Sequence, residues 1–321
     1  MFRPGSPLPS TGRAAESATD GAQAGQPRPL EDVRQPSAAE RVRTLVESNA
    51  SAALSIPGAD LDELGAGAPA ARTVTPDGDV LLLVPGDSTA ARAAAHAQDD
   101  DLTAVIEITD VAPVAVPHRI RGRGWLAGWL TPLRNEERAA GAMLLAERHP
   151  VGALLGTETG RGEGVDEALG PDAAPGAYGR PAWMLLRLEV GEGAVDDLWG
   201  AESVEPDDFA AAEADPLVQH EAELLQHLAA AHGDQVRGLC GLLGDRAVDA
   251  CGRRDRAVPV ALDRFGLRVR FTRESRSPGD RGADSVGGSF DARFDFPEPV
   301  RDVTELQRAM HVLFEAALHS D

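Results

Sequence analysis

The spacing of apolar residues is most regular at 216–243, where it predicts one long helix. Pro216 suits the first helical position, Asp215 the cap before it, and Gly244 the position just past the end. The apolar residues recur at three- and four-residue steps and share one helix face: Leu225, Leu228, Val236, Leu239 and Leu243.

Three histidines stand out in this predicted helix. His232 falls within the apolar stripe, whereas His220 and His227, seven residues apart, share a different and more polar face. The sequence therefore predicts that His232 lies apart from the other two.

The chain before this helix alternates between short helices and strands. Ser37 and Glu40 have capping-box spacing, and two apolar runs divided by Asp77-Gly78 predict a hairpin over 71–85. The remaining elements predicted here are helices at 37–49, 86–98 and 135–150 and strands or extended runs at 51–57, 102–109, 114–130 and 182–190. Many short antiparallel strands bounded by Gly and Pro favour a closed barrel.

The last hundred residues predict a compact α+β unit. Its elements after the long helix are a hairpin at 257–271 that turns at 263–266, a strand at 289–297 and a helix at 302–318. Asp302 and Glu305 form a variant of the capping box at the start of that final helix. The helix, three strands and helix together span about 100 residues, which is a common domain size.

Composition and charge narrow the function classes. The 321 residues allow two domains, and 52 acidic against 31 basic residues give a net charge of −21. Every basic residue other than histidine is arginine, so lysine Schiff bases and a P-loop are excluded. The acidic balance argues against nucleic-acid binding and against docking on anionic lipid.

Segments that would direct the chain to a membrane or an oxidising compartment are not evident. No apolar run reaches the roughly 18 residues of a membrane span, and the first residues lack the apolar region of a signal peptide. Cys240 and Cys251 lie eleven residues apart without a CxxC pair, which predicts neither a zinc site nor a disulfide framework. We expect a cytoplasmic protein without a membrane partner.

The C-terminal unit resembles the domain-of-unknown-function 2470 family. The resemblance rests on QHLAAAHGDQVRGL (226–239) and on RFDFPEPVRDVTELQRAMHVLFEAA (293–317). The family's signature is H-M-N-x-D-H-A-D, and His227, His232 and Asp234 match its two histidines and its later aspartate. The chain departs from the signature's methionine, asparagine and first aspartate, where it has Leu228, Ala229 and Ala231.

In that family the domain often follows a flavin-binding split barrel like that of pyridoxamine phosphate oxidases. The stretch ARTVTPDGDVLLLVPGDSTAARAAA (71–95) is similar to that barrel in its order of strand, turn, strand and short helix. Proteins with this pairing include HugZ-type haem-utilisation proteins and plastid glutamyl-tRNA-reductase-binding proteins. The resemblance implies an α+β protein: an antiparallel split β-barrel followed by a helix–three-strand–helix domain.

The expected domain boundaries follow from this pairing. They are a disordered segment at 1–36, a split barrel at 37–190, an acidic linker at 191–215 and the α+β domain at 216–321. The first segment is rich in Pro, Gly, Ser, Ala and Gln and has too few large apolar residues to offset its ordering entropy. Barrels of this type usually dimerise, so the resemblance implies a homodimer.

Flavin phosphate is the first candidate ligand. The oxidases hold it with a strand arginine and a Ser-Arg-Lys cluster at a helix start, and the matching positions here are Arg72, Ser88 and Thr89. The family's lysine position is Ala90, and Arg92 is one turn further on. The competing interpretation, which we favour, is that Ser88 or Thr89 caps the helix.

Haem is the second candidate ligand. HugZ-type proteins use a histidine to hold the iron, and His227 and His232 lie in the matching helix, with His311 and His319 near the chain's end. The competing interpretation for His232 is a core residue hydrogen-bonded to Asp234 or to a backbone carbonyl. A histidine on an apolar face is more often such a residue than a ligand.

Familiar catalytic motifs are absent from the sequence. It contains no GxSxG, HExxH or post-strand GxGxxG; the glycines at 156–164 predict a loop, and the acids at 99–101 a solvated helix end rather than a metal site. The sequence thus predicts a haem- or flavin-related binding protein and leaves enzymatic activity open. The alternative is a non-enzymatic regulatory module that binds another protein, as the plastid relatives do.

Overall fold

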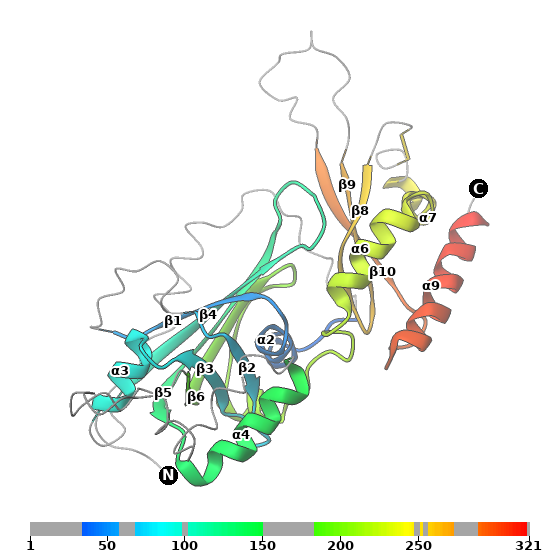
Figure 1. The fold of residues 1–321 in the computed structure, drawn as a ribbon. Coiled ribbons are helices and arrows are strands. Elements are labelled where there is room, and N and C mark those ends of the chain that lie inside the picture. Colours follow the sequence, from blue (N-terminus) through cyan, green and yellow to red (C-terminus); the bar gives the residue numbers. More distant parts are fainter. Residues whose placement is uncertain are drawn as a thin grey trace, which may run out of the picture.

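The computed structural model contains two antiparallel sheets, each packed against helices (Figure 1). It describes residues 34–57, 68–97, 102–149, 183–246, 251–252, 256–272 and 288–319. Most of the N-terminal segment predicted to be disordered, the acids at 99–101 and the loop at 156–164 lie outside the described residues. The mixed α+β class predicted from the sequence is confirmed.

The first sheet is a curled, antiparallel half-barrel. Its strands are β1 (Ser51–Ser55), β2 (Ala71–Val74), β3 (Val80–Pro85), β4 (Thr103–Val111), β5 (Ile120–Pro132), β6 (Trp183–Asp197) and β7 (Gly200–Val204). They pair in the order β1-β4-β5-β6-β3-β2. Strand β7 pairs with the C-terminal end of β6, on the side that β5 does not occupy. The predicted hairpin is confirmed: β2 and β3 pair antiparallel, and Gly78 in their turn has a φ of 91°, which favours glycine.

Helices cover both faces of this sheet. They are α2 (Ala38–Glu47), α3 (Thr89–His96), α4 (Asn135–Arg148) and α5 (Pro206–Ala211). Strand β3 is apolar without alternation because both of its faces are buried: Leu82 lies in the core with Val42 of α2, and Leu81 in the core with Leu145 of α4. The capping box predicted for Ser37 begins α2.

The stretch predicted as an acidic linker is largely part of this half-barrel. Residues 191–204 continue β6 and form β7, and α5 follows. Although acids dominate the composition, Val195, Val204 and Phe209 are buried in the core of the first sheet. Three buried apolar residues and strand pairing thus outweigh the acidic composition of this stretch. The barrel unit therefore extends beyond its predicted end at 190.

The second domain is a three-stranded antiparallel sheet with helices. Its elements are α6 (Glu221–Ala231), α7 (Gly233–Gly238), η2 (Leu239–Arg246), β8 (Arg256–Asp263), β9 (Gly266–Thr272), β10 (Ser289–Asp295) and α9 (Val303–Leu318). The strand order is β10-β9-β8. The predicted turn between Asp263 and Gly266 and the Asp302 cap of the final helix are confirmed. The prediction of one helix over 216–243 is wrong, because the chain bends at His232.

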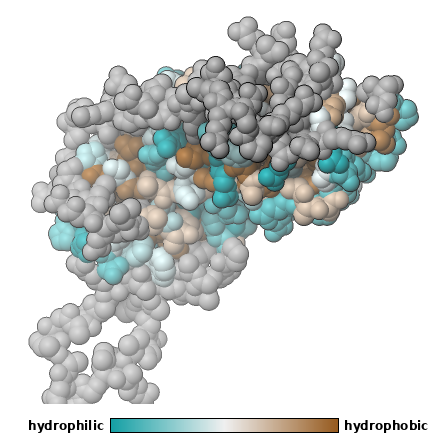
Figure 2. All heavy atoms as spheres, turned by 90° about the horizontal axis from the view of Figure 1, so that it is seen from above, coloured by the Kyte–Doolittle hydropathy of each residue, from teal (hydrophilic) through white to brown (hydrophobic). Residues whose placement is uncertain are grey.

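The two domains share part of a core. The turn between β4 and β5 belongs to the barrel sheet in sequence, yet Ala112, Val114 and Val116 are buried with the apolar residues of the second domain. Arg270 of β9 donates hydrogen bonds to the carbonyl oxygens of Pro117 and His118 in that turn, at 2.7 and 2.8 Å. Seen from above, the surface shows apolar patches separated by hydrophilic ones (Figure 2).

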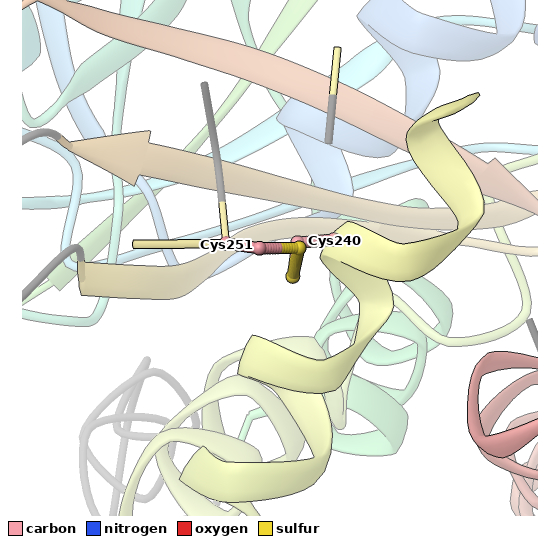
Figure 3. The surroundings of a disulfide bond; sticks show 2 residues. All are labelled: Cys240 and Cys251. Atoms are coloured by element: carbon pink, nitrogen blue, oxygen red, sulfur yellow. A yellow bond between two sulfur atoms is a disulfide. The ribbon is translucent and has the colours of Figure 1, made fainter. Parts of the chain in front are cut away.

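The two cysteines form a disulfide, contrary to the sequence-based prediction. Cys240 lies in η2 and Cys251 follows it, and their Cα atoms are 5.5 Å apart (Figure 3). Spacing along the chain did not reveal this contact, because the two cysteines are eleven residues apart in sequence and only the fold sets the distance between them. Disulfides are most common in oxidising compartments. The cytoplasmic location therefore stays a prediction, and none of the helices in the described ranges combines the length and apolarity needed to span a membrane.

Candidate functional site: a histidine pair at the α6–α7 bend

The bend between α6 and α7 brings His227 and His232 together. In a continuous helix, residues five apart point about 140° away from each other. At His232, however, φ is −122° and ψ is 21°, and α7 starts at Gly233, a poor helix former. As a result, the Nε2 atoms of His227 and His232 lie 3.2 Å apart, and their ring centroids are separated by 5.0 Å.

A third side chain determines which ring nitrogens of this pair carry protons. The Nδ1 atom of His232 contacts Oε1 of Gln235, which is an acceptor, so Nδ1 is the donor. In a neutral ring, Nε2 of His232 then carries the lone pair, and Nε2–H of His227 donates to it. The pair therefore presents one imidazole nitrogen with a free electron pair when the proton of His227 is displaced.

The surroundings hold His232 more firmly than His227. The ring of His232 is half-buried and stacks on Phe314 of α9, with centroids 6.4 Å apart and planes 21° apart. His227 is exposed on α6. Asp234, the partner suggested by the sequence, instead pairs with Arg237 at the surface. His232 therefore lies at the edge of the core. A ligand can approach its ring from the side on which the exposed His227 lies.

The other two histidines considered for haem, His311 and His319, lie away from this pair. His311 pairs with Glu315 at 3.1 Å, and His319 contacts the carbonyl oxygen of Glu315 at 2.7 Å. Within the described residues, no three His, Cys, Asp or Glu side chains come close enough together to hold a metal ion. Of the histidines considered for haem, the structure therefore brings together only His227 and His232.

Arg72, the predicted flavin-phosphate ligand, is engaged by the end of α2. Its Nε donates to the carbonyl oxygen of Val46 at 2.8 Å, and its Nη2 to those of Ser48 and Ala50 at 2.9 and 2.6 Å. Burial lowers the pKa of Arg72 to about 10. The guanidinium satisfies carbonyls that a helix C-terminus leaves without partners, so its donors are directed at the protein and do not fit a phosphate.

Ser88 and Thr89, the other predicted phosphate ligands, serve the start of α3. The side chain of Ser88 accepts a hydrogen bond from the backbone N–H of Ala91 at 3.1 Å, as an N-cap does. Thr89 accepts from Arg92 at 3.3 Å, and Arg92 also donates to the carbonyl oxygen of Asp87. These contacts correspond to the capping interpretation of the sequence.

A hollow beside the start of α2 is the second place considered for a ligand. It has a volume of about 660 Å³, and its lining includes Glu40, Glu202, Asp208 and Glu213. Haem propionates and flavin phosphates are anionic, and like charges at close range repel. The lining therefore does not suit either cofactor.

Sequence reasoning considered both histidines but missed their contact. The available signal was Gly233 directly after His232, since glycine in a helix interior costs about 1 kcal/mol relative to alanine. Gln235, which orients His232, had no signal of its own, because its role depends on the bend.

Comparisons with known proteins show the fold but no family. No family model matches the sequence, and no curated protein matches it. A haem-binding protein from Mycobacterium smegmatis superposes with a TM-score of 0.53 at 22% identity, over 89% of this chain and 99% of that one. A protein of unknown function from Agrobacterium tumefaciens gives 0.35 at 18% identity, over 89% and 100%. An FAD- and haem-binding protein from Mycobacterium smegmatis gives 0.33 at 16% identity, over 54% and 78%. The first of these shows that this chain shares its fold with a solved protein.

Proposed function

We propose that this protein is a haem- or flavin-related binding protein of the HugZ-like split-barrel group, with haem as the favoured ligand. The observation that carries the proposal is the imidazole of His232, whose Nε2 lone pair is set by the contact of Nδ1 with Gln235. Iron in haem is held by such a nitrogen. The fold shared with a haem-binding protein supports the proposal, as does the resemblance of 226–239 to the domain-of-unknown-function 2470 signature.

The geometry of the pair suits one imidazole on the iron rather than two. Two metal–nitrogen bonds of about 2.0 Å on opposite sides of a metal place the nitrogens about 4 Å apart. The Nε2 atoms of His227 and His232 are 3.2 Å apart, so one of the two imidazoles, rather than both, would hold the iron in this arrangement. His232 would hold the iron through Nε2, and His227, which donates to the same Nε2 lone pair in this structure, would give up that hydrogen bond.

Flavin is the less favoured ligand because the predicted phosphate contacts are used within the protein. Arg72 binds the carbonyls at the end of α2, and Ser88 caps α3. A flavin would need other residues for its phosphate.

The test is titration of the purified, cofactor-free full chain with haem and, separately, with FMN and FAD. We expect a shifted Soret band at one equivalent of haem. His232→Leu should abolish the shift while far-UV circular dichroism is retained, because a volume-matched apolar change is well tolerated beside Phe314. His311→Ala is the matched control and should bind haem normally. The absence of any spectral change with haem and with both flavins would refute the proposal.

A second candidate function is a non-enzymatic regulatory module that binds another protein. The structural use of Arg72 and Ser88 favours it, since the barrel then keeps the fold without its phosphate site. Affinity capture from native extract would distinguish the two: a stoichiometric partner together with no chromophore supports this candidate. Light scattering on the purified chain tests the proposed homodimer, and fractionation of the native host tests the proposed cytoplasmic location.

A further inference from the structure

We propose that His227 and His232 form a chelating site for a divalent transition-metal ion of the Zn²⁺, Ni²⁺ and Cu²⁺ class. Imidazole nitrogen is a preferred ligand of these ions. The site goes beyond the proposed haem or flavin function and needs neither cofactor to bind. It uses the Nε2 atoms of both rings on the same ion, whereas haem would be held by one.

The separation of the two nitrogens matches a shared ion. With zinc–nitrogen bonds of about 2.0–2.1 Å, two ligands at a tetrahedral angle lie roughly 3.3–3.4 Å apart, and two at a right angle roughly 2.9 Å apart. The Nε2 atoms of His227 and His232 are 3.2 Å apart, which lies between these values. Once the proton of His227 shifts from Nε2 to Nδ1, both Nε2 atoms carry lone pairs, and one metal ion can bind them with little movement of either ring.

The site also has the supporting contact that metal-bound histidines usually have. Such a histidine donates its other ring N–H to an acceptor, which sets the tautomer and the ring orientation. His232 makes this contact through Nδ1 to Oε1 of Gln235, and its ring stacks on Phe314. One ligand is thus oriented before the metal arrives, which reduces the entropy cost of binding.

The exposure of the pair determines what kind of site this is. His227 is exposed, and in the described part of the chain no third His, Cys, Asp or Glu joins the pair. Water would fill the remaining positions, so the site is open and its affinity is that of two ligands rather than four. The net charge of −21 favours a cation over an anion throughout the approach.

The experiment is calorimetric titration of the untagged, haem-free full chain with ZnCl₂, NiCl₂ and CuCl₂. We expect one equivalent of metal in the micromolar range. His227→Ala and His232→Leu should each weaken binding at least tenfold, and Gln235→Ala should weaken it severalfold without changing the stoichiometry. His311→Ala, which removes an exposed histidine elsewhere in the same domain, should leave the affinity unchanged.

Two outcomes would overturn the proposal. One is no saturable site in the wild-type chain; the other is unchanged affinity in both His227→Ala and His232→Leu. Circular dichroism of each variant without metal checks that the fold is intact. If a variant unfolds, its loss of metal binding is disregarded, and the Gln235→Ala titration tests the site instead. A positive metal titration with no haem uptake upholds this site and refutes haem binding, whereas haem uptake with no metal binding does the reverse.

Discussion

Arg121 of β5 joins the half-barrel to the second domain, and its removal should loosen that junction. Its Nη1 donates to Glu221 of α6 at 2.6 Å and to the carbonyl oxygen of Val260 in β8 at 3.0 Å. Its Nη2 donates to Asp110 of β4 at 2.7 Å. Burial by itself would lower the pKa of Arg121, but Glu221 and Asp110 raise it above its ordinary value, so the guanidinium stays charged.

The cost of Arg121→Ala follows from what it leaves behind. Glu221 and Asp110 would face each other without a counter-charge, and removal of one partner of a buried ion pair costs about 3–5 kcal/mol. Each carboxylate side chain is 21% exposed and keeps some contact with water. We therefore expect the lower end, about 3 kcal/mol, which lowers the urea midpoint by about 1 M at a slope of about 3 kcal/mol per M.

The assay is urea unfolding followed by two probes. All four tryptophans belong to the half-barrel unit, and Trp199 also packs against Arg268 and Arg293 of the second domain, so their fluorescence reports on the half-barrel and its junction. Far-UV circular dichroism reports on both domains. Coincident curves would justify a two-state analysis, and separated curves would show which domain unfolds first. Adding Glu221→Gln to Arg121→Ala should recover part of the loss, because one stranded charge is removed.

The control is Arg237→Ala, which breaks a pair with Asp234 at the surface. Exposed ion pairs contribute little, so its midpoint should stay close to that of the wild type. If Arg121→Ala shifts the midpoint no more than this control does, the inference that Arg121 holds the domains together is wrong.

Four further predictions concern stability. Arg72→Met should lower the free energy of unfolding by about 2–4 kcal/mol, because it leaves several helix-end carbonyls unpaired, and urea curves with and without FMN should show the same loss. Burial raises the pKa of Asp215 to about 6 from its ordinary 3.8, so the folded state binds this proton more tightly and gains stability as pH falls from about 6 to 3.8. Asp215→Asn should remove up to about 1.4 kcal/mol per pH unit from the slope of unfolding free energy against pH in this range. An unchanged slope would contradict this. Gly128→Ala should markedly lower the melting temperature, since its Cβ would lie 1.9 Å from a carbonyl oxygen of β6, whereas Gly238→Ala, with open space around it, should raise stability by about 0.5–1 kcal/mol. Cys251→Ser should cost about 3 kcal/mol under oxidising conditions and nothing in excess reductant, and a loss that persists in reductant would argue against the disulfide as its cause.

Local features of the fold were predictable from neighbouring residues. The Ser37–Glu40 capping box, the turn at Gly78 and the cap at Asp302 each depend on contacts within about four residues, and all three are present. Such contacts form in any tertiary setting that keeps the segment intact, so their sequence signals are dependable.

The candidate site was only half predictable. His227 and His232 were considered as ligands, but periodicity placed them on separate faces because it assumed a continuous helix. The bend at Gly233 changed the direction of His232 and created the contact with Gln235. For the flavin phosphate, the resemblance offered Arg72 as a ligand, and only the position of α2 beside it decided where its donors point.

The sequence by itself determined the α+β class with its two antiparallel sheets, the positions of most helices and hairpins, and the exclusion of lysine-dependent chemistry, because these depend on composition and on short-range pattern. Only the tertiary structure decided that residues 191–204 pair as strands, that Cys240 meets Cys251, and that two imidazoles converge. Those contacts depend on how the backbone turns between distant or differently facing residues, and a one-dimensional pattern carries no direct measure of that turn.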